Sequence, residues 1–204
     1  TDTADSLLKR LGVDDAVAAA FLRTDAMARQ ALWGRSGRNV TVETHDNNTL
    51  LKLSARWSPD DNGTFKRLVI EKTRQGFQSR VETAPLSASS RLASGTIQTS
   101  LFAATDDANI PDSIATQLAE IFSGDIDFHR ALRKGDRFSV VYETLEGDGE
   151  PLRTGRVLSA EFVNGGKTSQ AMWFQDPVAA GKGAYYTLDG TSPRRAHLAS
   201  PMES

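Results

Sequence analysis

The chain has 204 residues, with 24 Lys and Arg against 26 Asp and Glu, and therefore a net charge of −2. This length suffices for one large domain or two small ones, and the balanced charge argues against nucleic acid as a partner. The absence of cysteine excludes disulfide scaffolds, thiol nucleophiles and cysteine-ligated zinc. The longest purely apolar run, residues 16–22, is too short for a membrane span, and the first five residues are too acidic and polar for a signal peptide.

Three short helices are predicted at the start of the chain, because apolar residues recur there every three or four positions. The first helix ends at Gly12, and either Asp14 or Asp15 can cap the second. The third helix breaks across residues 34–37, which include two glycines.

The pattern then changes to an alternation of apolar and polar residues, which is typical of half-buried strands. The predicted strands are residues 40–43, 51–57, 65–71 and 77–81. The segments between them are rich in Asp, Asn and Gly, which favour hairpin turns. An antiparallel meander is therefore expected after the helices.

Residues 85–94, with the sequence PLSASSRLAS, contain four serines and only two long apolar side chains, Leu86 and Leu92. Such a composition is typical of a linker. We therefore predict two domains, at residues 1–92 and 93–204.

The second domain is predicted to contain one clear helix, from Pro111 to Gly124, and a shorter one from Phe128 to Arg133. Four strands are predicted after them, at residues 138–145, 156–163, 169–175 and 184–188. The predicted fold class is α+β, with two small domains that each combine short helices with an antiparallel sheet.

Motifs for hydrolytic chemistry are absent from the sequence. His45, His129 and His197 are far apart, and none begins a His-x-His, His-x-x-x-Asp or His-Glu-x-x-His pattern. No Gly-x-Ser-x-Gly motif marks a nucleophilic serine.

Aromatic side chains could form a sugar-stacking surface, but for Trp57 and Trp173, which lie in predicted strands, core packing is the preferred interpretation. The adjacent Tyr185 and Tyr186 are expected to point to opposite faces of one strand.

A series of motifs follows in a fixed order through the second half of the chain. They are residues 94–104 (SGTIQTSLFAA), 119–122 (AEIF), 125–128 (DIDF), 132–143 (LRKGDRFSVVYE), 155–162 (GRVLSAEF), 185–190 (YYTLDG) and 194–201 (RRAHLASP). This series resembles the segment that precedes the catalytic domain in lysostaphin-like (LytM-type) zinc endopeptidases of Gram-negative bacteria, metallopeptidase family twenty-three, which cut the peptides of peptidoglycan. More weakly, residues 5–13 (DSLLKRLGV) resemble the opening helix of a LysM-like or opacity-associated-protein-like module.

In that family the zinc ligands lie in a domain after the Ser-Pro that corresponds to Ser200-Pro201. The resemblance therefore implies zinc for a catalytic domain outside this chain, and no catalytic or metal-binding residue and no cofactor within it. The positions that match the family motifs are expected to be structural: Gly135, Asp136, Arg137, Phe138, Tyr142, Glu143, Tyr185, Tyr186, Asp189 and Gly190.

The resemblance implies a regulatory or positioning region of a periplasmic peptidoglycan-cleaving zinc metalloendopeptidase, without activity of its own. Its expected partners are its own catalytic domain, which it would position or autoinhibit, and peptidoglycan, and its expected location is the periplasm or cell envelope. The alternative hypothesis is a free-standing module that binds peptidoglycan or an envelope protein.

Overall fold

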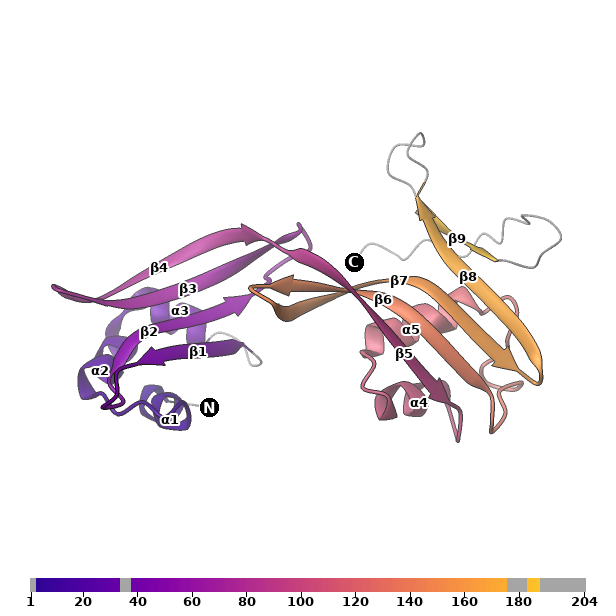
Figure 1. Cartoon of the computed structure of the whole chain (residues 1–204), viewed down its shortest axis with the longest axis horizontal. Helices are drawn as coiled ribbons and strands as arrows, with labels where there is room; N and C mark the ends of the chain where they lie inside the picture. Colours follow the sequence, from indigo (N-terminus) through magenta and orange to yellow (C-terminus); the bar gives the residue numbers. More distant parts are fainter. Residues whose placement is uncertain (1–2, 34–37, 176–182, 188–204) are drawn as a thin grey trace. The chain divides into compact units, whose positions relative to one another are not determined.

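The computed structural model describes residues 3–33, 38–175 and 183–187, which contain five helices and two sheets of four and five strands (Figure 1). The predicted α+β class with antiparallel sheets is confirmed. The chain forms two compact units, which we call unit 1 and unit 2. Unit 1 consists of the residues up to Ser87 together with Glu146–Leu152, and unit 2 of Ala88–Leu145 and the residues from Arg153 onward. The domain boundary between residues 92 and 93 stays a prediction.

Unit 1 begins with the helices α1 (Ala4–Arg10), α2 (Ala16–Thr24) and α3 (Ala26–Trp33). The N-cap of α2 is Asp15, whose side chain accepts a hydrogen bond from the backbone N–H of Ala18 at 3.0 Å. Its other carboxylate oxygen accepts one from the N–H of Leu50 at 3.1 Å. Asp15 therefore both starts the helix and ties it to the sheet. The predicted helix break at residues 34–37 lies outside the described residues.

The sheet of unit 1 has the strand order β1-β2-β3-β4, and all of its pairs are antiparallel. The strands are β1 (Asn39–Thr44), β2 (Leu50–Trp57), β3 (Thr64–Thr73) and β4 (Gly76–Pro85). Leu53, Leu68 and Ile70 are fully buried in one cluster with helical residues such as Leu22. The helices therefore cover the face on which these residues lie, and the alternate residues of each strand lie on the other face.

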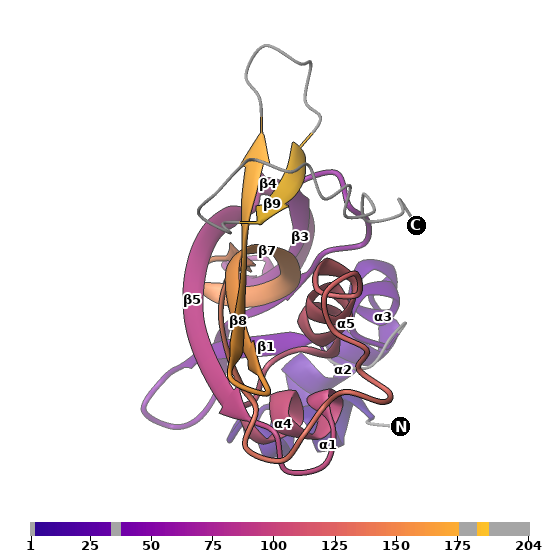
Figure 2. The ribbon, with the colours of Figure 1, turned by 90° about the vertical axis from the view of Figure 1, so that its right-hand side faces the viewer.

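Unit 2 has a five-stranded sheet in the order β5-β6-β7-β8-β9. Its elements are β5 (Ser87–Thr96), α4 (Leu101–Asp107), α5 (Asp112–Ile121), β6 (Arg137–Gly147), β7 (Glu150–Asn164), β8 (Lys167–Gln175) and β9 (Gly183–Thr187). Ile114 and Leu118 of α5 are fully buried in one cluster with Val140 of β6 and Phe162 of β7. Figure 2 shows α4 and α5 together on one side of this sheet.

Two local predictions are wrong. Residues 85–94 are not a linker, because Ser87–Thr96 form β5, which pairs with β6. Pairing satisfies the backbone of this segment although its side chains are small, and Ala93 still packs against the core. Residues 128–133 form turns instead of a helix; the N–H of Arg133 donates to the carboxylate of Asp136 at 2.7 Å, and the carbonyl of Ala131 accepts from the side chain of Asn164 at 2.9 Å. The helix α4 is an additional element that none of the predicted helices covers.

Among the described residues, no helix is long and apolar enough to cross a membrane.

Candidate functional site

The loop that leads into β6 contains the first two motif positions. Gly135 has a φ of 94°, which favours glycine, and its N–H donates to the carbonyl of Ile97 at 2.8 Å. Asp136 is 6% exposed and accepts hydrogen bonds from the N–H of Arg133, the N–H of Gly165 and the side chain of Asn164, at 2.7, 3.0 and 2.6 Å. Burial raises the pKa of Asp136, but these hydrogen bonds outweigh burial, so that its pKa lies below the ordinary value. Asp136 thus joins the loop before β6 to the turn between β7 and β8.

The next motif positions lie on β6 and alternate between the two faces of the sheet. Phe138 and Tyr142 are buried in the core of unit 2, and the ring of Phe138 stacks on Phe162 with centroids 6.0 Å apart. Arg137 is exposed and Glu143 is half-buried. The buried pair fills the core, whereas the charged pair is accessible on the opposite face.

Tyr185, a motif position on β9, is buried and only 3% exposed. Its hydroxyl donates to the carbonyl of Val157 at 2.9 Å, and its ring meets that of Trp173 edge-on with centroids 5.0 Å apart. Burial raises the pKa of Tyr185 to about 12. Tyr186 is half-buried and packs against Phe174, which is 55% exposed. Asp189 and Gly190 lie outside the described residues.

The two tryptophans that could stack on sugars are covered by arginines. The guanidinium of Arg38 lies 4.3 Å from the ring centroid of Trp57, and that of Arg156 lies 4.1 Å from the ring centroid of Trp173. Both indoles are also half-buried against their cores. In each of these tryptophans a guanidinium thus already occupies one face of the ring.

The described residues contain no group of three or more His, Asp or Glu side chains that could hold a metal ion. His45 lies on an exposed turn. His129 is also exposed and lies two residues after Asp127. His197 lies outside the described residues. The donor set described here does not fit zinc.

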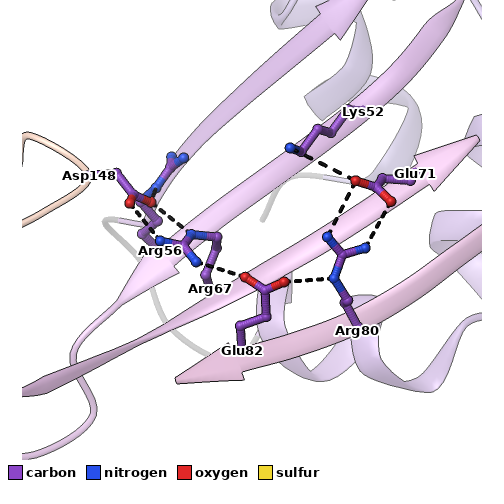
Figure 3. Close-up of polar contacts among 7 residues, drawn as sticks. All are labelled: Lys52, Arg56, Arg67, Glu71, Arg80, Glu82 and Asp148. Carbon is purple, nitrogen blue, oxygen red and sulfur yellow. Dashed lines mark hydrogen bonds and ion pairs between the residues drawn. The ribbon is translucent and has the colours of Figure 1, made fainter. Parts of the chain in front are cut away.

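A network of charged side chains covers the face of the unit 1 sheet that the helices leave open (Figure 3). Its members are Lys52, Arg56, Arg67, Glu71, Arg80, Glu82 and Asp148. Six of them come from β2, β3 and β4, and Asp148 comes from the turn between β6 and β7 that belongs to unit 1.

Asp148 neutralises two cations that would otherwise repel each other. Arg56 and Arg67 are directly opposite each other on β2 and β3, and like charges in that position destabilise a sheet. The carboxylate of Asp148 accepts two hydrogen bonds from Arg67, at 2.8 and 2.6 Å, and a further one from Arg56. These bonds lower the pKa of Asp148 to about 2, with Arg67 as the largest cause.

The rest of the network joins β3 to β4. Glu82 accepts from Arg67 and Arg80, each at 2.7 Å, and Glu71 accepts from Arg80 at 2.8 Å. The hydrogen bonds from Arg80 lower the pKa of both glutamates. The charges of this surface are thus used within unit 1 rather than directed toward a ligand.

Apolar contacts accompany the Asp148 ion pairs. Gly147 leaves no space for a side chain, because a Cβ there would lie 2.7 Å from Leu152 and 3.0 Å from the ring of Phe65. Phe65 is 2% exposed although it lies on the same face of β3 as Arg67. The turn therefore packs on this face as well as binding it through charge. The sequence indicated only the turn glycines, since the partners of Asp148 are 81 and 92 positions away.

Comparisons with known proteins identify relatives among peptidoglycan endopeptidases. The chain is 26% identical over 156 residues to the peptidoglycan DD-endopeptidase ShyC of Vibrio cholerae, in a match that covers 76% of this chain and 34% of that protein. It is 29% identical over 112 residues to the DD-carboxypeptidase/endopeptidase Mpg of Neisseria meningitidis, which covers 55% of this chain and 26% of that protein. No protein-family model matches the chain.

A similar solved structure is a zinc-containing peptidase from Vibrio cholerae, with 18% identity, a TM-score of 0.46, and coverage of 91% of this chain and 54% of that chain. The resemblance to LytM-type peptidoglycan endopeptidases is thus confirmed by the relatives. The chain spans about a quarter to a third of the length of these two curated relatives.

Proposed function

We propose that this chain is a regulatory and positioning region of a periplasmic zinc endopeptidase that cleaves peptidoglycan, and that it acts through the catalytic domain of that protein. The observation that carries the proposal is the match to ShyC, which includes 76% of this chain but only 34% of that endopeptidase. The described residues add a second argument, since their His, Asp and Glu side chains do not form a metal-binding group.

Such a region needs little intrinsic affinity for its catalytic domain. A covalent link keeps the two at a high effective concentration, so that weak contacts suffice to hold them together. To inhibit, the region needs only to bind the closed form of the catalytic domain better than the open form. To position, it needs only to orient the domain relative to the wall.

The first test adds this chain to the isolated catalytic domain of ShyC and measures the release of soluble fragments from labelled peptidoglycan sacculi. The expected result is a fall in the initial rate that saturates with chain concentration. The assay contains excess zinc, because sequestration of zinc by histidines would otherwise imitate inhibition. A rate that stays constant at saturating chain, in this assay and when the two parts are linked, contradicts regulation.

The second candidate function is a free-standing module that binds peptidoglycan. The observation that favours it is the pairing of the exposed Phe174 with the half-buried Tyr186, whose ring centroids are 5.9 Å apart. Sedimentation of the chain and of its Phe174→Ser variant with purified sacculi tests this candidate. Pelleting that disappears in the Phe174→Ser variant supports the module, whereas a chain that stays in the supernatant contradicts it.

A further inference from the structure

A groove crosses the face of the unit 2 sheet that α4 and α5 leave open. One cavity of about 240 Å³ and another of about 330 Å³ share Ser139 and Glu161 in their linings, so the two adjoin on this face, and we treat them together as one groove. The alternation of β6 places Arg137, Ser139 and Val141 on this face, because Phe138 and Val140 are buried in the core. Figure 2 shows the helices on the opposite side of the sheet.

The chemistry of the groove changes along its length. One end is lined by the exposed guanidinium of Arg137 beside Ser94 and Thr96. The centre contains the carboxylate of Glu161, which accepts a hydrogen bond from Gln170 at 2.9 Å. The other end is lined by Leu92 and Met172.

The apolar end is exposed to solvent, since Leu92 is 77% and Met172 is 49% exposed. Leu92 lies on β5 and Met172 on β8, with β6 and β7 between them, so that apolar side chains stand at both edges of this end. The groove therefore offers a cationic site, an anionic site and an end with aliphatic edges, in that order.

The two charges are available to a ligand. Within the described residues, Arg137 has no ion pair, and Glu161 is bonded by the neutral amide of Gln170 only. This differs from unit 1, where each member of the charged network faces a partner of opposite sign.

The length of the groove limits the size of the ligand. Arg137 and Val141 are four residues apart on one strand, which corresponds to about 13 Å at roughly 3.3 Å per residue. An extended peptide of three or four residues has about that length.

We propose that this groove binds the stem peptide of peptidoglycan, with a carboxylate of the peptide at Arg137, an amino group at Glu161 and an aliphatic portion between Leu92 and Met172. The choice of a wall peptide over the end of a protein chain rests on the proposed function, while the order of charges comes from the groove itself. Arginine suits the carboxylate because its guanidinium can donate two parallel hydrogen bonds. Binding here would hold unit 2 to the wall.

The test is an NMR titration of the isotope-labelled full chain with the stem tripeptide alanyl-γ-D-glutamyl-diaminopimelate. We expect saturable changes in the chemical shifts of the backbone amides of β6, β7 and β8 around Ser139, Glu161 and Gln170. Blocking the amino groups by acetylation, or the carboxylates by amidation, is expected to weaken binding about tenfold in each case, because one charged hydrogen bond is lost.

Variants of Glu161 and Arg137 test which charged group of the peptide each of these side chains binds. Glu161→Gln is expected to weaken the free tripeptide about tenfold but leave the acetylated one unchanged, and Arg137→Gln is expected to do the same for the amidated one. The matched controls are Glu143→Gln, on the same face of β6 but outside the groove lining, and Arg130→Gln, an exposed arginine on a turn. Both controls are expected to bind as the unchanged chain does.

Three results overturn the proposal: no shift in the groove amides, equal binding of the blocked peptides, or equal binding of an ordinary L-alanyl-L-glutamyl-L-lysine peptide. The titration measures binding of a peptide to the chain alone, whereas the inhibition assay measures the initial rate of the ShyC catalytic domain, so failure of one is distinguishable from failure of the other. Conversely, if the chain binds the tripeptide but does not change the rate of the ShyC catalytic domain, regulation is overturned and the peptide-binding groove still stands.

Discussion

Replacement of Asp148 by Asn tests the role of the charged network in unit 1. Asp148 has a φ of 53°, and Asn is tolerated in this left-handed region, so the variant keeps the turn and removes only the charge. It leaves Arg56 and Arg67 facing each other across β2 and β3 without the carboxylate that binds both.

The magnitude follows from the ionisation of Asp148. The fall of its pKa from 3.8 to about 2 corresponds to at most about 2.5 kcal/mol of stabilisation at pH 7. The side chain is 32% exposed, and solvent screening reduces this to about 1 kcal/mol. Because the pKa is lowered in the folded state, this stability is present above about pH 4 and is lost as the pH falls toward about pH 2.

Hydrogen exchange followed by mass spectrometry measures this effect locally. In Asp148→Asn, the amides of residues 146–152 are expected to exchange about fivefold faster at pH 7, which corresponds to about 1 kcal/mol of opening free energy. The matched control is Asp46→Asn, which removes the same charge from an exposed turn of unit 1 and is expected to have no effect on residues 146–152. Equal exchange in the Asp148 variant and the unchanged chain refutes the reasoning.

Three further changes test the packing of unit 2 by thermal or denaturant unfolding. Asp136→Ala removes the acceptor of three hydrogen bonds and is expected to cost about 2–4 kcal/mol, whereas Asp125→Ala, at an exposed position nearby, is expected to cost less than about 0.5 kcal/mol; equal losses contradict the role of Asp136. Tyr185→Phe is expected to cost about 1–2 kcal/mol because it leaves the Val157 carbonyl without its partner. Because burial raises the Tyr185 pKa to about 12, stability present below about pH 10 should be lost toward pH 12, and Tyr185→Phe should remove an ionisation near pH 12 from the ultraviolet titration of the chain; loss of an ionisation near pH 10 instead would contradict this. Gly95→Ala places a Cβ 2.7 Å from the buried ring of Phe138 and is expected to cost about 1–3 kcal/mol, while Gly124→Ala, with open space around it, serves as the control; similar stability of the two variants would show that the ring yields freely.

The elements that the sequence predicted well are those with local signals. Asp15 caps α2, and Pro111 immediately precedes α5, because a cap acts within one helical turn. The turns near Asn48 and Gly76 both have positive φ, which the residue types favour. These features depend on residues close together in the sequence, so residue type and spacing are enough to predict them.

The elements that the sequence mispredicted depend on distant partners. β5 consists mostly of serine, alanine and other small residues, and becomes a strand because β6 lies beside it. Residues 128–133 similarly form turns in place of the predicted helix, and the side chain of Asn164, 33 positions away, donates to the carbonyl of Ala131 there at 2.9 Å. Local propensity loses in both cases to hydrogen bonds formed by tertiary structure.

The candidate surfaces were the least predictable from sequence. Arg137 was identified as a motif position, but its place in a groove with Glu161 and Leu92 depends on three strands meeting side by side. The role of Asp148 depends on Arg56 and Arg67, far earlier in the chain. No periodic pattern in one sequence encodes such pairings.

The measurement that tests the central claim most directly is the rate of sacculus hydrolysis by the ShyC catalytic domain linked to this chain, compared with the same domain alone at equal concentration and excess zinc. The account predicts that the linked protein differs from the isolated domain in rate, and that cleaving the linker with a site-specific protease partly restores the rate of the isolated domain, since effective concentration falls. Equal rates before and after cleavage would contradict a regulatory or positioning role.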